Sequence, residues 1–134
     1  MTAPRLLLDT SVVIEPPASG LAESHGGGAL STITIAELEF GVSATSDPLL
    51  RSVRRDRIER LTATFDVLGF GLGTAAHYGV LAAMLRAAGR NPRPLRLDLL
   101  IAASAVEHGL ALATRNPDVF RHLERALTVI PVKD

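Results

Sequence analysis

The sequence predicts an α/β fold with a short central parallel sheet and helices on both of its faces. Short apolar runs alternate with longer helical patterns along the chain, and this alternation is typical of parallel strand–helix–strand units. No internal repeat and no low-complexity tract interrupts the pattern. A length of 134 residues corresponds to one domain, which we expect to span residues 1–134.

The expected strands are short apolar runs that end at polar or turn-forming residues. The first run ends at Asp9, and the third resembles a buried strand that Gly71 and Gly73 separate from the next helix. In chain order, strands are predicted at residues 5–8, 29–33, 64–70, 110–114 and 127–132.

Capping and stop signals mark the helix boundaries. Asp47 followed by Pro48 is a helix start with proline at the first helical position, and Gly89 ends a later helix. Prolines and glycines within 15–28 indicate a short helix between loops, and residues 90–96 form a connector rich in arginine and proline. Longer helices are predicted at about residues 34–45, 47–62, 74–88, 98–108 and 117–125.

Composition limits the classes of function. A hydrophobic fraction of 47% supports a real core, and the absence of cysteine excludes disulfides, thiolate metal sites and a cysteine nucleophile. The sequence shows neither a signal-peptide pattern at its N-terminus nor an apolar run long enough for a membrane span, so we expect a soluble, cytoplasmic protein. The net charge of zero gives no whole-molecule field that would indicate a nucleic-acid binder.

Arginine is concentrated in two segments of the chain. Arginine suits bidentate recognition of phosphate or carboxylate groups. The alternative for the first segment is a solvated helix face on which Asp56 and Glu59 act as partners. The two segments contain Arg51, Arg54, Arg55, Arg57 and Arg60, and then Arg86, Arg90, Arg93 and Arg96.

Four acidic residues lie far apart in the chain but occupy similar places in the predicted elements. Asp9, Glu37 and Asp118 come after apolar runs, and Asp98 opens an apolar helix. In an open parallel sheet, the C-termini of the strands and the helix N-termini that follow them gather at one edge. The four carboxylates would therefore converge, and such a cluster is costly unless a divalent cation neutralises it. Oxygen ligands with retained waters suit Mg²⁺ or Mn²⁺.

Each acid also has a purely structural interpretation. Thr34 and Glu37 match a capping box, in which the glutamate binds the backbone N–H of the cap residue. Asp98 and Asp118 lie in first turns of predicted helices, where a negative charge interacts favourably with the helix dipole. Asp9 would end its strand in an Asx turn. Capping explains why an acid is tolerated at each site, but it does not explain why one edge would collect four.

The motifs around these acids occur in the order found in a known family. The chain resembles the PIN-domain family over nearly its whole length, and in particular the VapC-type toxins of bacterial toxin–antitoxin pairs. The resemblance implies a single PIN-like domain and a metal-dependent endoribonuclease. It is carried by Asp9-Thr10-Ser11, by residues 34–41 (Thr-Ile-Ala-Glu-Leu-Glu-Phe-Gly), by residues 98–103 (Asp-Leu-Leu-Ile-Ala-Ala) and by residues 114–120 (Thr-Arg-Asn-Pro-Asp-Val-Phe).

By matching position, the resemblance implies that Asp9 and Asp98 are the principal ligands of Mg²⁺ or Mn²⁺. Glu37 and the last acidic position would complete the catalytic pocket. The set of candidate catalytic residues is therefore Asp9, Glu37, Asp98 and Asp118, supported by Ser11, Arg115 and Asn116.

The last acidic position departs from the family pattern. Family members often have an acid where Asn116 stands, and in this sequence only Asp118 carries a charge. Asn116 would coordinate weakly through its amide oxygen or through a water. The identity of the fourth ligand therefore stays open between these two residues.

The resemblance also implies partners. These are an RNA substrate, a small VapB-like antitoxin that occludes the active site, and a second copy of the chain in a homodimer within the toxin–antitoxin complex. The apolar faces of helices 34–45 and 47–62 are expected to form the antitoxin groove. Its rim would carry Arg51, Arg54 and Arg55.

Two other functions remain open for the same fold, and two further classes fail. A PIN-fold nuclease of RNA processing and a PIN-fold binding module without activity both fit the motifs. Gly71, Gly73 and Ala76 match a dinucleotide-binding fingerprint, but the acid expected about 20 residues later is missing. A phosphoacceptor receiver domain needs a lysine beside its acids, and the only lysine is Lys133.

Overall fold

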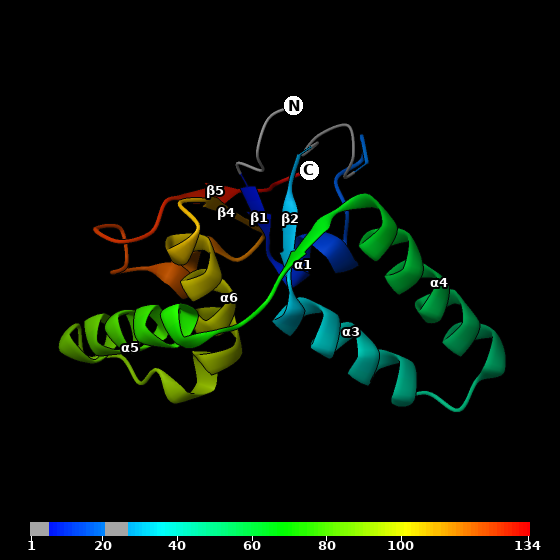
Figure 1. Cartoon of the computed structure of the whole chain (residues 1–134), viewed down its shortest axis with the longest axis horizontal. Helices are drawn as coiled ribbons and strands as arrows, with labels where there is room; N and C mark the ends of the chain where they lie inside the picture. The colour runs from blue at the N-terminus through cyan, green and yellow to red at the C-terminus, as the bar shows by residue number, and fades with distance from the viewer. Residues whose placement is uncertain (1–5, 21–26) are drawn as a thin grey trace.

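A computed structural model describes residues 6–20 and 27–134, and these form a parallel sheet of five strands in the order β3-β2-β1-β4-β5 (Figure 1). The predicted fold class is confirmed. The strands are β1 (Leu6–Leu8), β2 (Ala29–Ser31), β3 (Asp66–Leu68), β4 (Ala111–Thr114) and β5 (Val129–Pro131). The helices are α1 (Thr10–Ile14), α3 (Thr32–Ser43), α4 (Pro48–Thr64), α5 (Leu72–Ala87) and α6 (Arg96–Glu107), with 3₁₀ turns η1 (Arg93–Leu95) and η2 (Pro117–Phe120).

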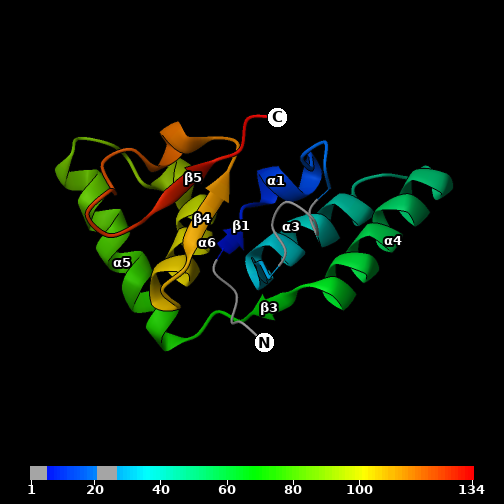
Figure 2. The same cartoon turned by 90° about the horizontal axis from the view of Figure 1, so that it is seen from above.

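The sheet separates two hydrophobic cores. Successive strand residues point to opposite faces, so that Leu7 packs in one core and Leu8 in the other. The first core receives α5 and α6 through Leu81, Leu85 and Leu99, among others. The second receives α1, α3 and α4, and Figure 2 shows these helices on the side opposite to α5 and α6.

Several predicted boundaries and caps are confirmed. Asp47 is the N-cap of α4 and accepts a hydrogen bond from the backbone N–H of Leu49 at 3.0 Å, with Pro48 in the first turn. Gly89 lies just beyond α5 with a φ of +82°, a conformation that glycine adopts without steric cost. Among the described residues, no helix is both long and apolar enough to cross a membrane.

The segment after the first strand differs from the prediction. A helix that was not predicted, α1, follows Asp9 directly and ends at Ile14. Residues 15–20 are not helical. The remainder of the short helix expected within 15–28 falls on residues 21–26, which lie outside the described part of the chain, and stays a prediction.

Two strand predictions also need correction. The third strand was expected to be buried, yet Asp66 and Val67 are exposed, because β3 pairs only with β2 at the sheet edge. The second strand was expected to reach residue 33, but it ends at Ser31, whose hydroxyl caps α3 by accepting from the N–H of Ile33 at 3.0 Å. Near the C-terminus, the helix expected over 117–125 is only the turn η2.

Candidate functional site

Asp9 lies at the end of β1, beside the end of its neighbour β4. Its backbone N–H donates to the carbonyl of Ala113 at 2.9 Å, which continues the pairing of the two strands. The side chain is only 3% exposed. Its Oδ2 accepts two hydrogen bonds of 2.8 Å, one from Ser11 Oγ and one from Thr114 Oγ1. Two hydroxyl groups therefore fix the orientation of this buried carboxylate.

The other oxygen of the same carboxylate is left without a partner. Asp9 Oδ1 is buried and makes no hydrogen bond within the described residues. An unpaired polar atom in such a place carries a desolvation cost of roughly 1–3 kcal/mol, more if it is charged. A cation bound to Oδ1 would remove that cost. The donor chemistry at this atom thus fits a hard divalent ion that takes oxygen ligands.

Glu37 lies one turn into α3, on the neighbouring strand–helix unit. Its Oε1 accepts a 2.7 Å hydrogen bond from Thr10 Oγ1, and Thr10 in turn lies 2.9 Å from Thr34 Oγ1. The capping-box interpretation of Glu37 is therefore wrong, because Ser31 caps the helix and Thr34 is already inside it. The position of Glu37 in α3 directs its carboxylate toward α1 and the end of β1.

Asp98 lies in the first turn of α6, and its pKa is raised from 3.8 to about 6. The largest cause is burial, and the next causes are the negative charges of Asp9 and Glu37. Asp9 and Glu37 are therefore both close enough to Asp98 to repel its negative charge. The α6 N-terminus would favour a negative charge at this place, but burial and repulsion outweigh it. No hydrogen bond reaches the Asp98 side chain from the described residues.

Asp118 occupies a different environment. It lies in η2, its side chain is exposed, and it is not among the charges that act on Asp98. Asn116 is exposed too, and its side chain makes no capping hydrogen bond. Its backbone N–H donates to Thr114 Oγ1 at 3.0 Å, which ties the turn to the hydroxyl that holds Asp9.

The supporting residues Ser11 and Arg115 are connected to each other. The backbone N–H of Arg115 donates to Ser11 Oγ at 3.1 Å. The guanidinium of Arg115 points elsewhere, and donates to the carbonyls of Glu15 at 2.7 Å and Asp134 at 3.0 Å. Arg115 therefore braces α1 and the C-terminal segment, and its charge is not directed at the carboxylates.

Three threonines that the sequence interpretation did not select contribute most of this support. Thr10, Thr34 and Thr114 are all buried. The hydroxyls of Thr10 and Thr34 bond to each other, Thr10 also donates to Glu37, and Thr114 donates to Asp9. The available signal was position, because Thr10 follows Asp9 directly and Thr114 ends a strand. Threonine is common in strands and at helix starts, so this signal was hidden by ordinary structural preferences.

The acidic side chains of the site do not form a closed set of metal ligands. Within residues 6–20 and 27–134, no three acidic or histidine side chains are already gathered into a metal-holding group. Mg²⁺ is ordinarily bound by one or two carboxylates and several waters. Asp9 and Asp98 therefore fit such an ion as a sparse ligand pair, with Glu37 beside it.

Three arginines of α4 bond to α3 or to the loop that follows it. Arg55 forms a two-pronged ion pair with Glu39, with N–O distances of 2.7 and 2.9 Å, and the interaction lowers the pKa of Glu39. Arg51 and Arg54 donate to the carbonyls of Thr45 and Gly41. The expected partners Asp56 and Glu59 form no ion pair with these arginines within the described residues, although the charge of Glu59 acts on Arg55.

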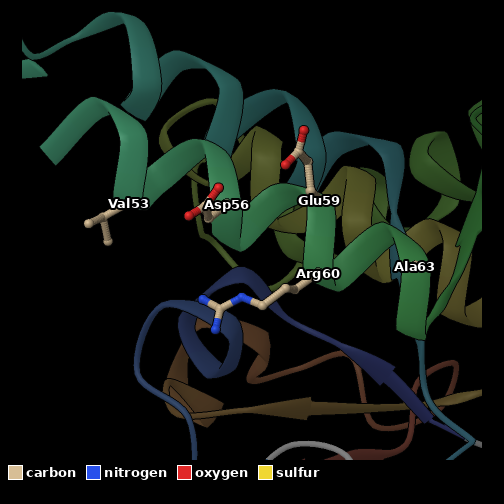
Figure 3. Close-up of a pocket in the computed structure, with 5 residues that line it drawn as sticks. All are labelled: Val53, Asp56, Glu59, Arg60 and Ala63. Carbon is tan, nitrogen blue, oxygen red and sulfur yellow. The ribbon is translucent and has the colours of Figure 1, made fainter. Parts of the chain in front are cut away.

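Two surface hollows lie away from the carboxylates. One of about 490 Å³ runs along α4, and Figure 3 shows Arg60 reaching from it toward α1 while Asp56 and Glu59 project from the helix. The second, of about 320 Å³, lies between α1 and α4 and combines an apolar floor with two arginines. Its lining includes Val13, Pro16, Leu61 and Phe65, with Arg57 and Arg60.

Comparison with known proteins supports the same interpretation of the fold. A PIN domain model matches residues 6–126. The chain is 34% identical to ribonuclease VapC4 of Mycobacterium tuberculosis, covering 88% of this chain and 91% of that protein. It is 29% identical to the tRNA(fMet)-specific endonuclease VapC of Shigella flexneri, with coverages of 89% and 92%.

A solved structure gives the same result in three dimensions. The chain superposes with a TM-score of 0.76 on a chain of VapBC-5, a toxin–antitoxin system of Mycobacterium tuberculosis, at 30% identity, covering 98% of this chain and 100% of that one. The family model spans β1 to β4 and the four acidic candidates Asp9, Glu37, Asp98 and Asp118, whereas β5 lies beyond its end. The chain therefore belongs to the PIN-domain family, within the VapC ribonucleases of toxin–antitoxin systems.

Proposed function

We propose that the chain is the toxin of a type II toxin–antitoxin pair and that it cleaves RNA as an endoribonuclease dependent on Mg²⁺ or Mn²⁺. The observation that carries the proposal is the group of three carboxylates from separate segments, with one buried oxygen of Asp9 left unpaired. Structural ion-pair chemistry does not explain it, because no cationic side chain in the described part of the chain pairs with these acids.

In this proposal, Asp9 Oδ1 and the carboxylate of Asp98 hold the cation. When bound there, such an ion would supply a positive charge for the scissile phosphate and would make a water more acidic. Glu37 contributes through Oε2, the oxygen that Thr10 does not occupy, by orienting that water and accepting its proton. Ser11 and Thr114 hold the carboxylate of Asp9 in one orientation by donating to its Oδ2. Among the described residues, no histidine is among the charges that act on Asp98.

The proposed antitoxin partner is supported by the fold match to a VapBC complex. The hollow between α1 and α4 offers an apolar floor for such a segment, with Arg57 and Arg60 at its edge. The rim was expected to carry Arg51, Arg54 and Arg55, but these bond to α3 or to the loop that follows it. In this proposal, Arg57 and Arg60 take their place at the rim. A segment that orders on binding would pay an entropy cost and recover it over a large contact area.

The proposed homodimer is supported by one helix face. The exposed side of α5 carries small residues at intervals of four, which allow another helix to approach closely. Leu72 and Val80 on the same helix are 93% and 55% exposed. The small residues are Ala75, Gly79, Ala83 and Ala87.

The central test measures cleavage and growth together. The purified chain should cleave structured RNA with Mg²⁺ or Mn²⁺, and cleavage should stop when EDTA is added. Expression of the chain without its antitoxin should slow growth. Cleavage that continues in excess EDTA would disprove the metal dependence. Cleavage in vitro without any effect on growth would indicate a nuclease of RNA processing instead, and metal binding without cleavage would indicate an inactive binding module.

A further inference from the structure

Thr10 occupies a position between two elements that carry proposed functional groups. It is the first residue of α1, directly after Asp9, and its Oγ1 lies 2.7 Å from Glu37 Oε1 and 2.9 Å from Thr34 Oγ1. Thr10 is 8% exposed and Thr34 is fully buried, so water does not compete at the second contact. One hydroxyl therefore joins α1 to α3 at the point where Glu37 enters the site.

The direction of these hydrogen bonds follows from counting protons. A threonine hydroxyl has one proton to donate, and an ionised carboxylate only accepts. Thr10 must use its proton for Glu37, so the proton in the contact with Thr34 comes from Thr34. The result is a one-way chain from Thr34 to Thr10 to Glu37. Within such a chain, each donor polarises the next and strengthens its bond.

The chain fixes one oxygen of Glu37 and leaves the other free. Oε1 is held by Thr10, whereas Oε2 has no hydrogen bond among the described residues. Because Thr10 is bonded through the backbone to Asp9, the same contact sets the spacing between the two carboxylates. We propose that Thr10 and Thr34 are positioning residues that hold Glu37 Oε2 toward the cation and its water, an inference that rests on the proposed function of that site.

The first test needs neither RNA nor metal. Glutamate side-chain carboxyl carbons are labelled with ¹³C, and the Glu37 resonance is assigned by its loss in Glu37→Gln. We expect this resonance to shift in Thr10→Val and in Thr34→Val, and to return close to its wild-type position in Thr10→Ser, which keeps the hydroxyl. A resonance unchanged in Thr10→Val would overturn the proposal even if the protein is an active ribonuclease.

The second test measures Mn²⁺ affinity by calorimetry. Removing a hydrogen bond to a charged group is expected to weaken binding by about tenfold in Thr10→Val, with Thr10→Ser within about twofold of wild type. Thr34→Val should weaken Mn²⁺ binding by about twofold to threefold, because Thr34 acts on Glu37 only through Thr10. The double variant should bind no more weakly than Thr10→Val alone, and this non-additivity is the signature of a serial chain. Additive losses would disprove it.

A matched control separates positioning from general weakening of the fold. Thr62 lies on α4 and its hydroxyl donates only to the carbonyls of its own helix, those of Ile58 and Glu59. Thr62→Val should leave both the Glu37 resonance and the Mn²⁺ affinity unchanged. If it matches the effect of Thr10→Val, the threonine network has no specific role. If the wild-type chain binds no Mn²⁺ and cuts no RNA, the proposed function fails, and the resonance test still decides whether the chain of hydroxyls holds Glu37.

Discussion

The acidic pocket and the turn that follows β4 both carry residues from the family motif, but the two regions differ in burial and in hydrogen bonding. In the pocket, Asp9 and Glu37 receive three hydroxyl hydrogen bonds, and Asp98 is held close to both charges. In the turn, Asp118 and Asn116 are exposed, and their side chains receive no such support. The carboxylates of Asp9 and Glu37 are thus held by hydrogen bonds, whereas the side chains of Asn116 and Asp118 lie at the surface.

The difference identifies where changes should matter. A functional group holds its position when its rotamer is locked by neighbours. By this criterion, Asp9 and Glu37 are the held groups of the pocket, and Asp98 joins them through its closeness to both charges. Asp118 and Asn116 meet neither condition. The sequence alone ranked Asp118 with the other three, because charge and motif position carry no information about burial.

The largest effect is expected from Asp98→Asn. This variant should lower RNA cleavage by about a hundredfold or more, since it removes a charge that the proposed cation needs. Its fold should survive, because asparagine is tolerated in a first helical turn and one repulsive charge is lost. Circular dichroism checks the fold, and Asp56→Asn on the exposed face of α4 is the control. An Asp98→Asn protein with wild-type cleavage would remove this residue from the mechanism.

The support of Asp9 can be broken at Thr114. Thr114→Val removes a donor to Asp9 Oδ2 and the acceptor of the Asn116 N–H, inside a fully buried site. We expect the free energy of unfolding to fall by about 2 kcal/mol. Urea denaturation measures it. Asn116→Ala should change the same quantity by less than about 0.5 kcal/mol, as expected for an exposed side chain, and equal losses in the two variants would contradict the comparison.

The burial of Asp98 and its repulsion by Asp9 and Glu37 predict a dependence of stability on pH. The pKa of Asp98 is about 6 in the folded protein, above its usual 3.8, so the folded state binds this proton more tightly than the unfolded state. The stabilisation is complete below about pH 4 and is lost as the pH rises through 6. After discounting for solvent around this partly exposed side chain, the loss is about 1 kcal/mol.

Thermal unfolding without metal, measured from pH 4 to pH 7.5, tests this dependence. The difference between Asp98→Asn and the wild type should grow by about 1 kcal/mol in favour of the variant across that range. Adding Mg²⁺ at pH 7.5 should reverse it by stabilising only the wild type. A difference independent of pH would show that burial and the two neighbouring carboxylates do not raise the pKa of Asp98 in solution.

The smallest effects are expected at the turn. Asp118→Asn and Asn116→Ala should each weaken Mn²⁺ binding by less than about threefold, because exposed groups interact weakly with a charge through solvent. The larger of the two losses identifies the residue that reaches the ion. A tenfold loss at Asp118 would show that this turn closes over the site when the cation binds.

The fold was largely predictable because its signals are local. Alternating apolar runs and helices, with Asp47-Pro48 and Gly89 as boundaries, specify the parallel sheet and most helix ends. The errors arose where position in the sheet decides burial. Val67 lies in an apolar run, but it belongs to the edge strand β3 and is exposed. An apolar run alone does not distinguish an edge strand from a central one.

The site was predictable in part for a related reason. Convergence of strand ends follows from parallel topology, which explains why Asp9 and Glu37 could be placed on one edge. The hydroxyl support was not predictable, because the Thr114–Asp9 contact joins residues 105 positions apart and the Thr10–Glu37 contact joins residues 27 positions apart. Such contacts depend on strand register, and sequence spacing does not define them.

The long separation between Asp9 and Thr114 has a consequence during synthesis of the chain. Asp9 leaves the ribosome early, but β4, which pairs with β1 and supplies the hydroxyl for Asp9, is made more than a hundred residues later. Contacts of such long range form late, because the intervening loop must be closed first. The pocket is therefore assembled only when nearly all of the chain has been translated, and a nascent or prematurely ended chain carries Asp9 without a finished site.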